Sequence, residues 1–186
     1  MKFRNLLIIS ALLIALFTGC GQQAAQNGTQ TTTPTTTTDA VTSASIVDNA
    51  AAFEKAISNN NGTWIICLTK DLTVDKDIVL DGEYKNGKKD DAGKDIIQRK
   101  VALYAQDADR NVTARYTLTA PKFTIKSPEA SIQHGTFKGD LYVSVKNFKL
   151  IDTTVDGNVY FTTDEAKNTF NADEKSKING KQELKK

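Results

Sequence analysis

A tandem repeat between Phe123 and Phe161 constrains the fold of this chain more than any other feature. Ser131–Ser144 (SIQHGTFKGDLYVS) aligns without a gap on Lys149–Thr162 (KLIDTTVDGNVYFT). One further step back at the same spacing leads from 141–143 to 123–125, where the alternation of apolar and polar residues recurs. A fixed period of about 18 residues in β-type sequence predicts coils that stack on one another, each contributing the same strands.

The repeat also predicts where its side chains point. Tyr142 and Tyr160 each stand between two apolar residues, so in a strand the apolar neighbours point inward and the tyrosines outward. Phe123, Leu141 and Val159 are then expected to line one interior column. Because adjacent strands lie about 4.8 Å apart, the two tyrosine rings should stack on neighbouring coils. Such a pair is suited to bind a sugar ring, although the same ladder also stabilises a sheet that binds nothing.

Two other pairs occupy equivalent positions in the repeat. Gly139 matches Gly157, which predicts a bend that requires a positive φ at both residues. Lys138 matches Asp156, and this exposed pair of opposite charges is expected to contribute only weakly to stability. Both pairs are interpreted as structural features.

The N-terminus has the features of an export signal. Met1–Asn5 carries two basic residues, and the apolar run Leu6–Phe17 is too short to span a membrane as a permanent helix. The residues Phe-Thr-Gly-Cys at 17–20 resemble the lipobox of bacterial lipoproteins. The resemblance implies cleavage before Cys20, a diacylglycerol on its sulfur and attachment to the extracytoplasmic face of a membrane. An ordinary signal peptide with an incidental cysteine is the alternative, and the choice between inner and outer membrane stays open.

These features divide the chain into four predicted parts. They are a signal peptide (1–19), a lipidated cysteine with a Thr- and Gln-rich disordered tether (20–45), a β domain (46–181) and a polar tail (182–186). Cleavage would remove two basic residues, so 24 basic residues become 22 and balance the 22 acidic ones. A neutral chain without a clustered basic face argues against a nucleic-acid partner.

The β domain is expected to begin with a helix. Val47–Ser58 has Asp48 as a candidate N-cap and places Phe53 and Ile57 on one face. The segment Asn49–Leu80 resembles the opening of right-handed β-helix proteins of the pectate-lyase-like superfamily, in which such a helix closes one end of the solenoid. We therefore predict an all-β fold: a single short right-handed parallel β-helix with coils of about 18 residues and an N-terminal capping α-helix. An antiparallel β-sandwich is the alternative.

Irregular segments interrupt the predicted strands. Asp81–Lys100 is rich in charged residues and is interpreted as an exposed hairpin or loop, and Asp107–Asn111 as a second polar loop. Pro121 and Pro128 are expected at corners, because proline cannot donate to a central ladder.

Few residues suggest chemistry. Cys67 lies in an apolar strand and is expected to be a buried structural thiol. His134, the only histidine, matches Asp152 in the repeat, and we interpret it as a corner residue rather than a general base. One histidine and one free cysteine cannot supply a zinc site, and the acidic residues between Asp71 and Asp95 alternate with lysines, which disfavours calcium. No catalytic residue, metal or cofactor is predicted.

The sequence predicts a fold and a cellular location but no reaction. The favoured hypothesis is a monomeric, membrane-anchored extracytoplasmic lipoprotein. Its non-catalytic β-solenoid would bind envelope glycan through Tyr142 and Tyr160, or bind a protein partner. The alternatives are a small polysaccharide lyase or hydrolase, and a structural or assembly protein.

Overall fold

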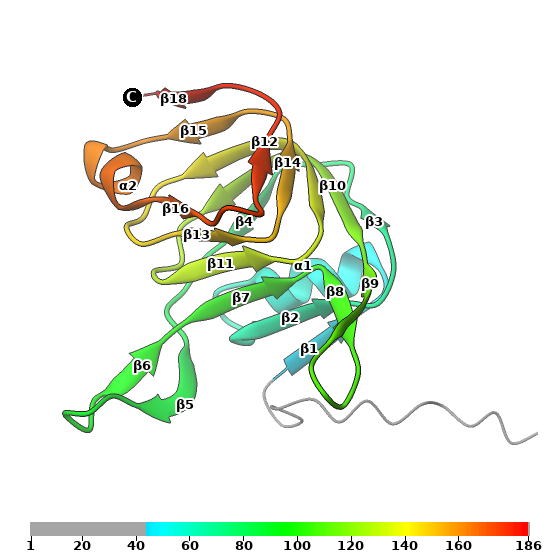
Figure 1. Ribbon diagram of the computed structural model, residues 1–186, viewed down its shortest axis with the longest axis vertical. Helices are drawn as coiled ribbons and strands as arrows, with labels where there is room; N and C mark the ends of the chain where they lie inside the picture. Colours follow the sequence, from blue (N-terminus) through cyan, green and yellow to red (C-terminus); the bar gives the residue numbers. More distant parts are fainter. Residues whose placement is uncertain (1–43, 186) are drawn as a thin grey trace, which may run out of the picture. The chain divides into compact units, whose positions relative to one another are not determined.

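The computed structural model describes residues 44–185, which are mostly β. The predicted signal peptide (1–19), the predicted lipidation site Cys20 and the tether up to residue 43 lie outside the described residues. Two large sheets form the framework, and strands from successive segments of the chain lie side by side in each (Figure 1).

The first sheet has six strands in the order β1-β2-β7-β11-β13-β16, all parallel. Its strands are β1 (Ala44–Val47), β2 (Ile65–Leu68), β7 (Arg99–Ala102), β11 (Ala130–Gln133), β13 (Lys149–Ile151) and β16 (Asn171–Ala172).

The second sheet has eight strands, again all parallel, and bends along its length. The two long strands β10 and β12 run through the bend, and the shorter strands pair with one half of them or with one another. Its strands are β3 (Leu72–Thr73), β4 (Ile78–Leu80), β10 (Thr117–Ile125), β12 (Thr136–Val143), β14 (Thr154–Asp156), β15 (Val159–Phe161), β17 (Lys177–Ile178) and β18 (Gln182–Leu184).

Antiparallel pairing among the described residues is confined to two hairpins. One is formed by β5 (Lys85–Lys89) and β6 (Asp95–Ile97), the other by β8 (Tyr104–Gln106) and β9 (Val112–Arg115). The β5–β6 hairpin lies in the segment predicted as an excursion (81–100), and the predicted loop 107–111 is the turn between β8 and β9. The end of the first prediction was wrong, because Arg99 and Lys100 belong to β7 and Arg99 is buried. The parallel pairing of both large sheets contradicts the antiparallel sandwich.

The predicted interior column is present. Phe123 pairs with Leu141, which pairs with Val159, and all three side chains are fully buried. In the other half of the sheet, Leu118 and Phe137 form an equivalent buried pair. Like side chains therefore lie on like side chains in neighbouring strands, as a constant period requires.

The register of β10 changes where the sheet bends. Lys122 pairs with Asp140 at the spacing of the repeat, whereas Thr119 pairs with Lys138, one position further along the chain. Ala120 and Pro121 lie in the bulge between these pairs. A bulge accommodates one extra residue and a proline that lacks a backbone donor, so Pro121 marks a corner as expected.

Glycines stack at the same bend. A side chain on Gly139 would collide with the carbonyl of Ala120, one on Gly157 with the carbonyl of Gly139, and one on Gly180 with the carbonyl of Gly157. Gly139 has the predicted positive φ, of 135°, but Gly157 does not. The second half of that prediction was wrong: Gly157 is required by the close approach of the neighbouring coil.

The predicted helix is α1 (Ala50–Ile57), which buries Phe53, Ala56 and Ile57. Its N-cap is Asn49 and not Asp48, because the Asn49 side chain accepts a hydrogen bond from the backbone N–H of Ala52 at 2.9 Å. Asp48 instead accepts from the Asn49 side chain. The helix packs against β1, β2 and β4 and covers one end of the core.

A second helix, α2 (Asp164–Thr169), interrupts the repeat after β15. Thr163 caps its N-terminus by accepting from the N–H of Ala166, which is buried. The insertion lengthens the spacing between paired strands, so that Thr154 pairs with the distant Lys177. The strands extend beyond the predicted domain at both ends, because β1 begins at Ala44 and β18 ends at Leu184, within the predicted tail.

A buried arginine joins three parts of the fold. Arg99, at the start of β7, is fully buried and donates to the backbone carbonyls of Asp81 and Ala56, each at 2.8 Å. Its guanidinium lies 3.8 Å from the centre of the Tyr84 ring. Burial lowers the pKa of Arg99, but the ordinary value is so high that the group stays charged at neutral pH. Arg99 thus satisfies carbonyls at the end of α1 and connects the helix to the β5–β6 hairpin.

Candidate functional site

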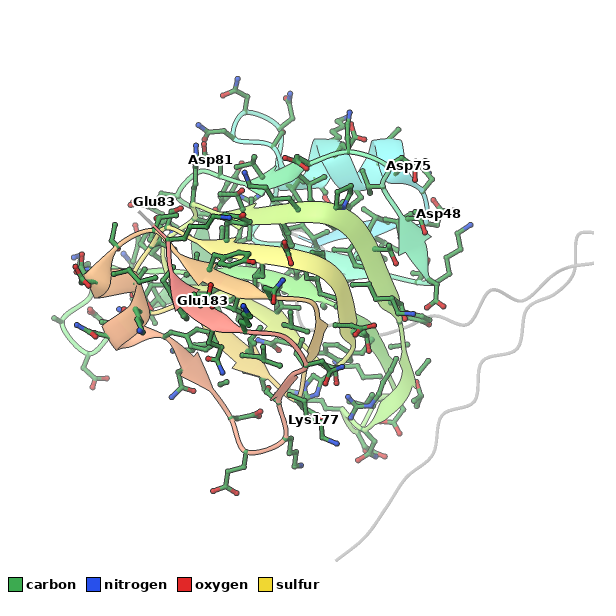
Figure 2. The ribbon with its side chains drawn as sticks, turned by 90° about the horizontal axis from the view of Figure 1, so that it is seen from above. Asp48, Asp75, Asp81, Glu83, Lys177 and Glu183 are labelled. Carbon is green, nitrogen blue, oxygen red and sulfur yellow. The ribbon has the colours of Figure 1, made fainter. Side chains whose placement is uncertain are left out.

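The two tyrosines of the repeat lie side by side on the outer face of the eight-stranded sheet. Tyr142 on β12 pairs with Tyr160 on β15, and their ring centroids are 4.9 Å apart. The ring planes meet at 45°, so the pair is tilted and not flat. Thr124 and Glu183 continue the same column on either side, and Figure 2 shows Glu183 on the last strand of the stack. We call Tyr142, Tyr160 and the two lysines described next the tyrosine surface.

Lysines cover the tyrosine rings. Lys122 Nζ lies over the Tyr142 ring, 4.5 Å from its centroid, and Lys185 Nζ lies over the Tyr160 ring at the same distance. Lys185 Nζ also donates to the Tyr142 hydroxyl at 3.1 Å, and this hydrogen bond raises the pKa of Lys185. Within residues 44–185, neither lysine forms an ion pair with a carboxylate. The surface therefore presents two ammonium groups held against aromatic rings.

Sequence reasoning identified the tyrosines but missed both lysines. Lys185 falls in the predicted polar tail, yet it follows β18 directly. Its backbone N–H donates to the backbone carbonyl of Phe161 at 2.8 Å. Lys122 follows the bulge in β10. Because Lys122 pairs with Asp140 at the spacing of the repeat, it could have been placed on this face, whereas Lys185 belongs to a coil with a different spacing.

The only histidine lies in a second polar cluster, at a corner of the stack. His134 Nδ1 is 3.1 Å from Asp152 Oδ2, and Arg115 donates to the same carboxylate. The Tyr104 ring meets the imidazole edge to face, with centroids 4.6 Å apart. The hydrogen bond from Arg115, followed by that from His134, lowers the pKa of Asp152. The residue that matches His134 in the repeat, Asp152 on the neighbouring coil, is therefore its carboxylate partner.

The backbone explains why these residues meet. His134 and Asp152 have φ values of 59° and 49°, which places both in the left-handed region at equivalent positions of the repeat. Glu129 and Asn147, again equivalent in the repeat, have φ values of 51° and 58°, and the Asn147 amide donates to Glu129. Each pair thus occupies matching corners of successive coils. This arrangement agrees with the predicted role of His134 as a corner residue. The His134 imidazole, the Asp152 carboxylate and the Arg115 guanidinium together also form a group that could transfer a proton.

Cys67 is partly exposed and not fully buried as predicted. Its strand, β2, lies at the beginning of the stack, where Cys67 pairs with the exposed Ile46 on one side and with Ala102 on the other. Burial nevertheless raises the pKa of the Cys67 thiol, which disfavours the reactive thiolate at neutral pH.

Neither a metal-binding cluster nor a membrane-spanning helix is found within residues 44–185. No three His, Cys, Asp or Glu side chains in this part of the chain are grouped so that they could hold a metal ion. No helix in the same range is long and apolar enough to cross a membrane.

No protein-family model, curated protein or solved structure matches the chain. Function is therefore inferred from the chemistry of the described surface.

Proposed function

We propose that the described domain is a single right-handed parallel β-helix, as in the pectate-lyase-like proteins that its N-terminal part resembles. The parallel pairing of strands from successive segments supports this proposal, together with the stacked interior column. The handedness follows from the general preference of parallel β-crossover-β connections for the right-handed form.

We further propose that the protein is a membrane-anchored extracytoplasmic lipoprotein, held by lipid on Cys20, whose solenoid binds envelope glycan without catalysing a reaction. The observation that carries glycan binding is the outward-facing pair of Tyr142 and Tyr160 with ammonium groups over both rings. Aromatic rings offer sugars an apolar face, and the lysine and tyrosine donors suit hydroxyl or acidic oxygens. The same surface could alternatively bind a protein partner.

Replacement of both tyrosines tests this proposal. We expect Tyr142→Ala/Tyr160→Ala to reduce retention of the full chain, held in detergent, on bacterial cell-wall polysaccharide by about tenfold, because both aromatic contacts are removed. Tyr142→Phe/Tyr160→Phe keeps the rings and should retain most of the binding. Thermal unfolding of each variant checks that the fold is preserved. Unchanged retention of a folded alanine variant would eliminate the tyrosine surface as the glycan site.

One observation favours a lyase or hydrolase as the second candidate. The His134–Asp152 pair with Arg115 is the described group best suited to proton transfer. Release of unsaturated sugars from cell-wall polysaccharide, abolished in His134→Ala, would support a lyase. The absence of product from the native chain would count against it.

One observation also bears on the assembly hypothesis. β16, β17 and β18 each pair with a strand on one side only within residues 44–185, and exposed strand edges can pair with a second chain. Lys177 and Lys181 lie on or beside these strands, and charged residues of this kind oppose such pairing. Growth of particle size with concentration would favour assembly over a monomer.

A further inference from the structure

Three lysines around the tyrosine surface form no ion pairs with carboxylates among residues 44–185. Lys122 and Lys185 contact tyrosines but no carboxylate, and Lys138 on the same sheet has neither a hydrogen-bond nor an ion-pair partner in its side chain among residues 44–185. The ion pair predicted between Lys138 and Asp156 does not form, although the two residues are neighbours in register. Three amines on this face are thus available to an external anion.

Three acidic side chains on the same face have partners within the fold. Asp140 accepts from the backbone N–H and the side-chain amide of Asn158, at 3.1 and 2.9 Å. Asp156 accepts from the Asn179 amide at 3.4 Å, and Glu183 lies 3.6 Å from the Lys181 amine. The hydrogen bonds occupy one oxygen of Asp140 and one of Asp156 and leave both carboxylates charged, while Glu183 lies beside Lys181. The amines of Lys122, Lys138 and Lys185 are the charged groups beside the tyrosines that form no ion pair among residues 44–185.

A shallow hollow extends this surface along the sheet. Its volume is about 460 Å³, and its lining includes Asp75, Thr119, Pro121 and Lys138. Lys122 follows Pro121 directly in the chain, so the hollow adjoins the tyrosine surface at this lysine. The Asp75 carboxylate also has no partner among the described residues and could accept from sugar hydroxyls. Figure 2 shows Asp75 toward the α1 end of the stack, away from Glu183.

The spacing of these groups defines the length of a ligand. Lys138 precedes Tyr142 by four residues on β12, which corresponds to roughly 13 Å along an extended strand and somewhat less across the bend. A single sugar cannot reach both the hollow and the tyrosine pair, whereas a short run of linked sugars can.

We propose that the ligand of this face is an extended acidic glycan. Resting on the proposed glycan-binding function, this inference names the recognised feature: carboxylate or phosphate groups along the chain. One acidic group binds between Lys122 and Lys185 above the tyrosines, and a neighbouring unit occupies the hollow beside Lys138. The ammonium groups over the rings make an acidic substituent on the bound sugars their complementary partner.

Matched polymers test the inference. The full chain in detergent is passed over beads carrying dextran, carboxymethyl-dextran or phosphorylated dextran, which share one backbone and differ in their acidic groups. We expect retention on at least one acidic polymer, weakening as salt rises, and none on dextran. Lys122→Gln/Lys185→Gln should reduce that retention at least about fivefold, and Lys138→Gln should reduce it further.

The control variant is Lys94→Gln/Lys149→Gln, which removes the same charge from the β5–β6 turn and from the six-stranded sheet. It should retain binding within about twofold of the native chain. Equal retention on dextran, equal loss in the control, or no retention on either acidic polymer would overturn the acidic-ligand inference. Glycan binding itself is judged separately by the tyrosine variants on cell-wall polysaccharide. Stronger retention on the phosphorylated than on the carboxymethylated polymer would identify phosphate as the group recognised.

Discussion

Arg99→Met should lower the free energy of unfolding by about 3 kcal/mol, the larger of the two stability losses expected here, because the carbonyls of Ala56 and Asp81 would lose their charged donor. Each unsatisfied buried acceptor costs about 1–3 kcal/mol. The stacking of the guanidinium on Tyr84 would also be lost. Removal of the buried charge offsets part of this cost, which limits the expected loss in the free energy of unfolding.

Urea unfolding followed by fluorescence measures this loss. Trp64 is the only tryptophan, and its carbonyl accepts from the N–H of Lys100 at 2.7 Å, so it reports on the region around Arg99. Arg115→Met is the control, because Arg115 has an exposed side chain and should cost less than about 1 kcal/mol. If Arg99→Met were as mild as this control, Arg99 would not hold the helix and the hairpin to the sheet.

Gly157→Ala should destabilise the fold by about 2–3 kcal/mol, as expected when an extra methyl group is forced into a close-packed position. This methyl group meets the carbonyl of Gly139 on the neighbouring coil, and relief requires a local separation of the two strands. Because each backbone in the glycine column rests on the next, the strain cannot be absorbed by rotation of a flexible side chain.

The matched control is Gly87→Ala in the β5–β6 hairpin. No heavy atom outside its chain neighbours lies within 4 Å of the added methyl group, so the cost is limited to a positive φ of 79°. That conformation costs an alanine about 1–2 kcal/mol, and part of the hairpin can relax. Chemical denaturation of both variants gives the comparison, and a smaller loss for Gly157→Ala than for Gly87→Ala would contradict close contact between the coils.

The sequence predicted the central part of the fold well because its coils are equal in length. From β11 to β15 every paired position keeps the same spacing, so alignment of the chain on itself gives the strand register directly. The signal faded where α2 adds residues, since the spacing between partners then becomes longer. Residues 182–186 were consequently predicted as a polar tail, although Leu184 pairs with Phe161.

The same reasoning explains which parts of the candidate site were found. Tyr142 and Tyr160 share a position in equal coils, and the equivalence of His134 with Asp152 was likewise visible in the repeat. Lys185 comes from the irregular last coil and could not be placed. The hollow depends on the bulge at Pro121, where one extra residue shifts the register and no periodic signal remains.

The central claim is that residues one coil apart occupy the same position on adjacent parallel strands. Lys138→Cys/Asp156→Cys tests it directly in a Cys67→Ser background, because both positions are exposed and paired in register. Neighbouring strands hold paired Cα atoms at about 5 Å, within the range of a disulfide. Mild oxidation followed by peptide mass spectrometry should show a cross-link between the two introduced thiols, and none for Lys138→Cys/Lys149→Cys, whose second site is on the other sheet. Failure of the first pair to cross-link, or equal cross-linking of the second, would contradict the stacked-coil fold.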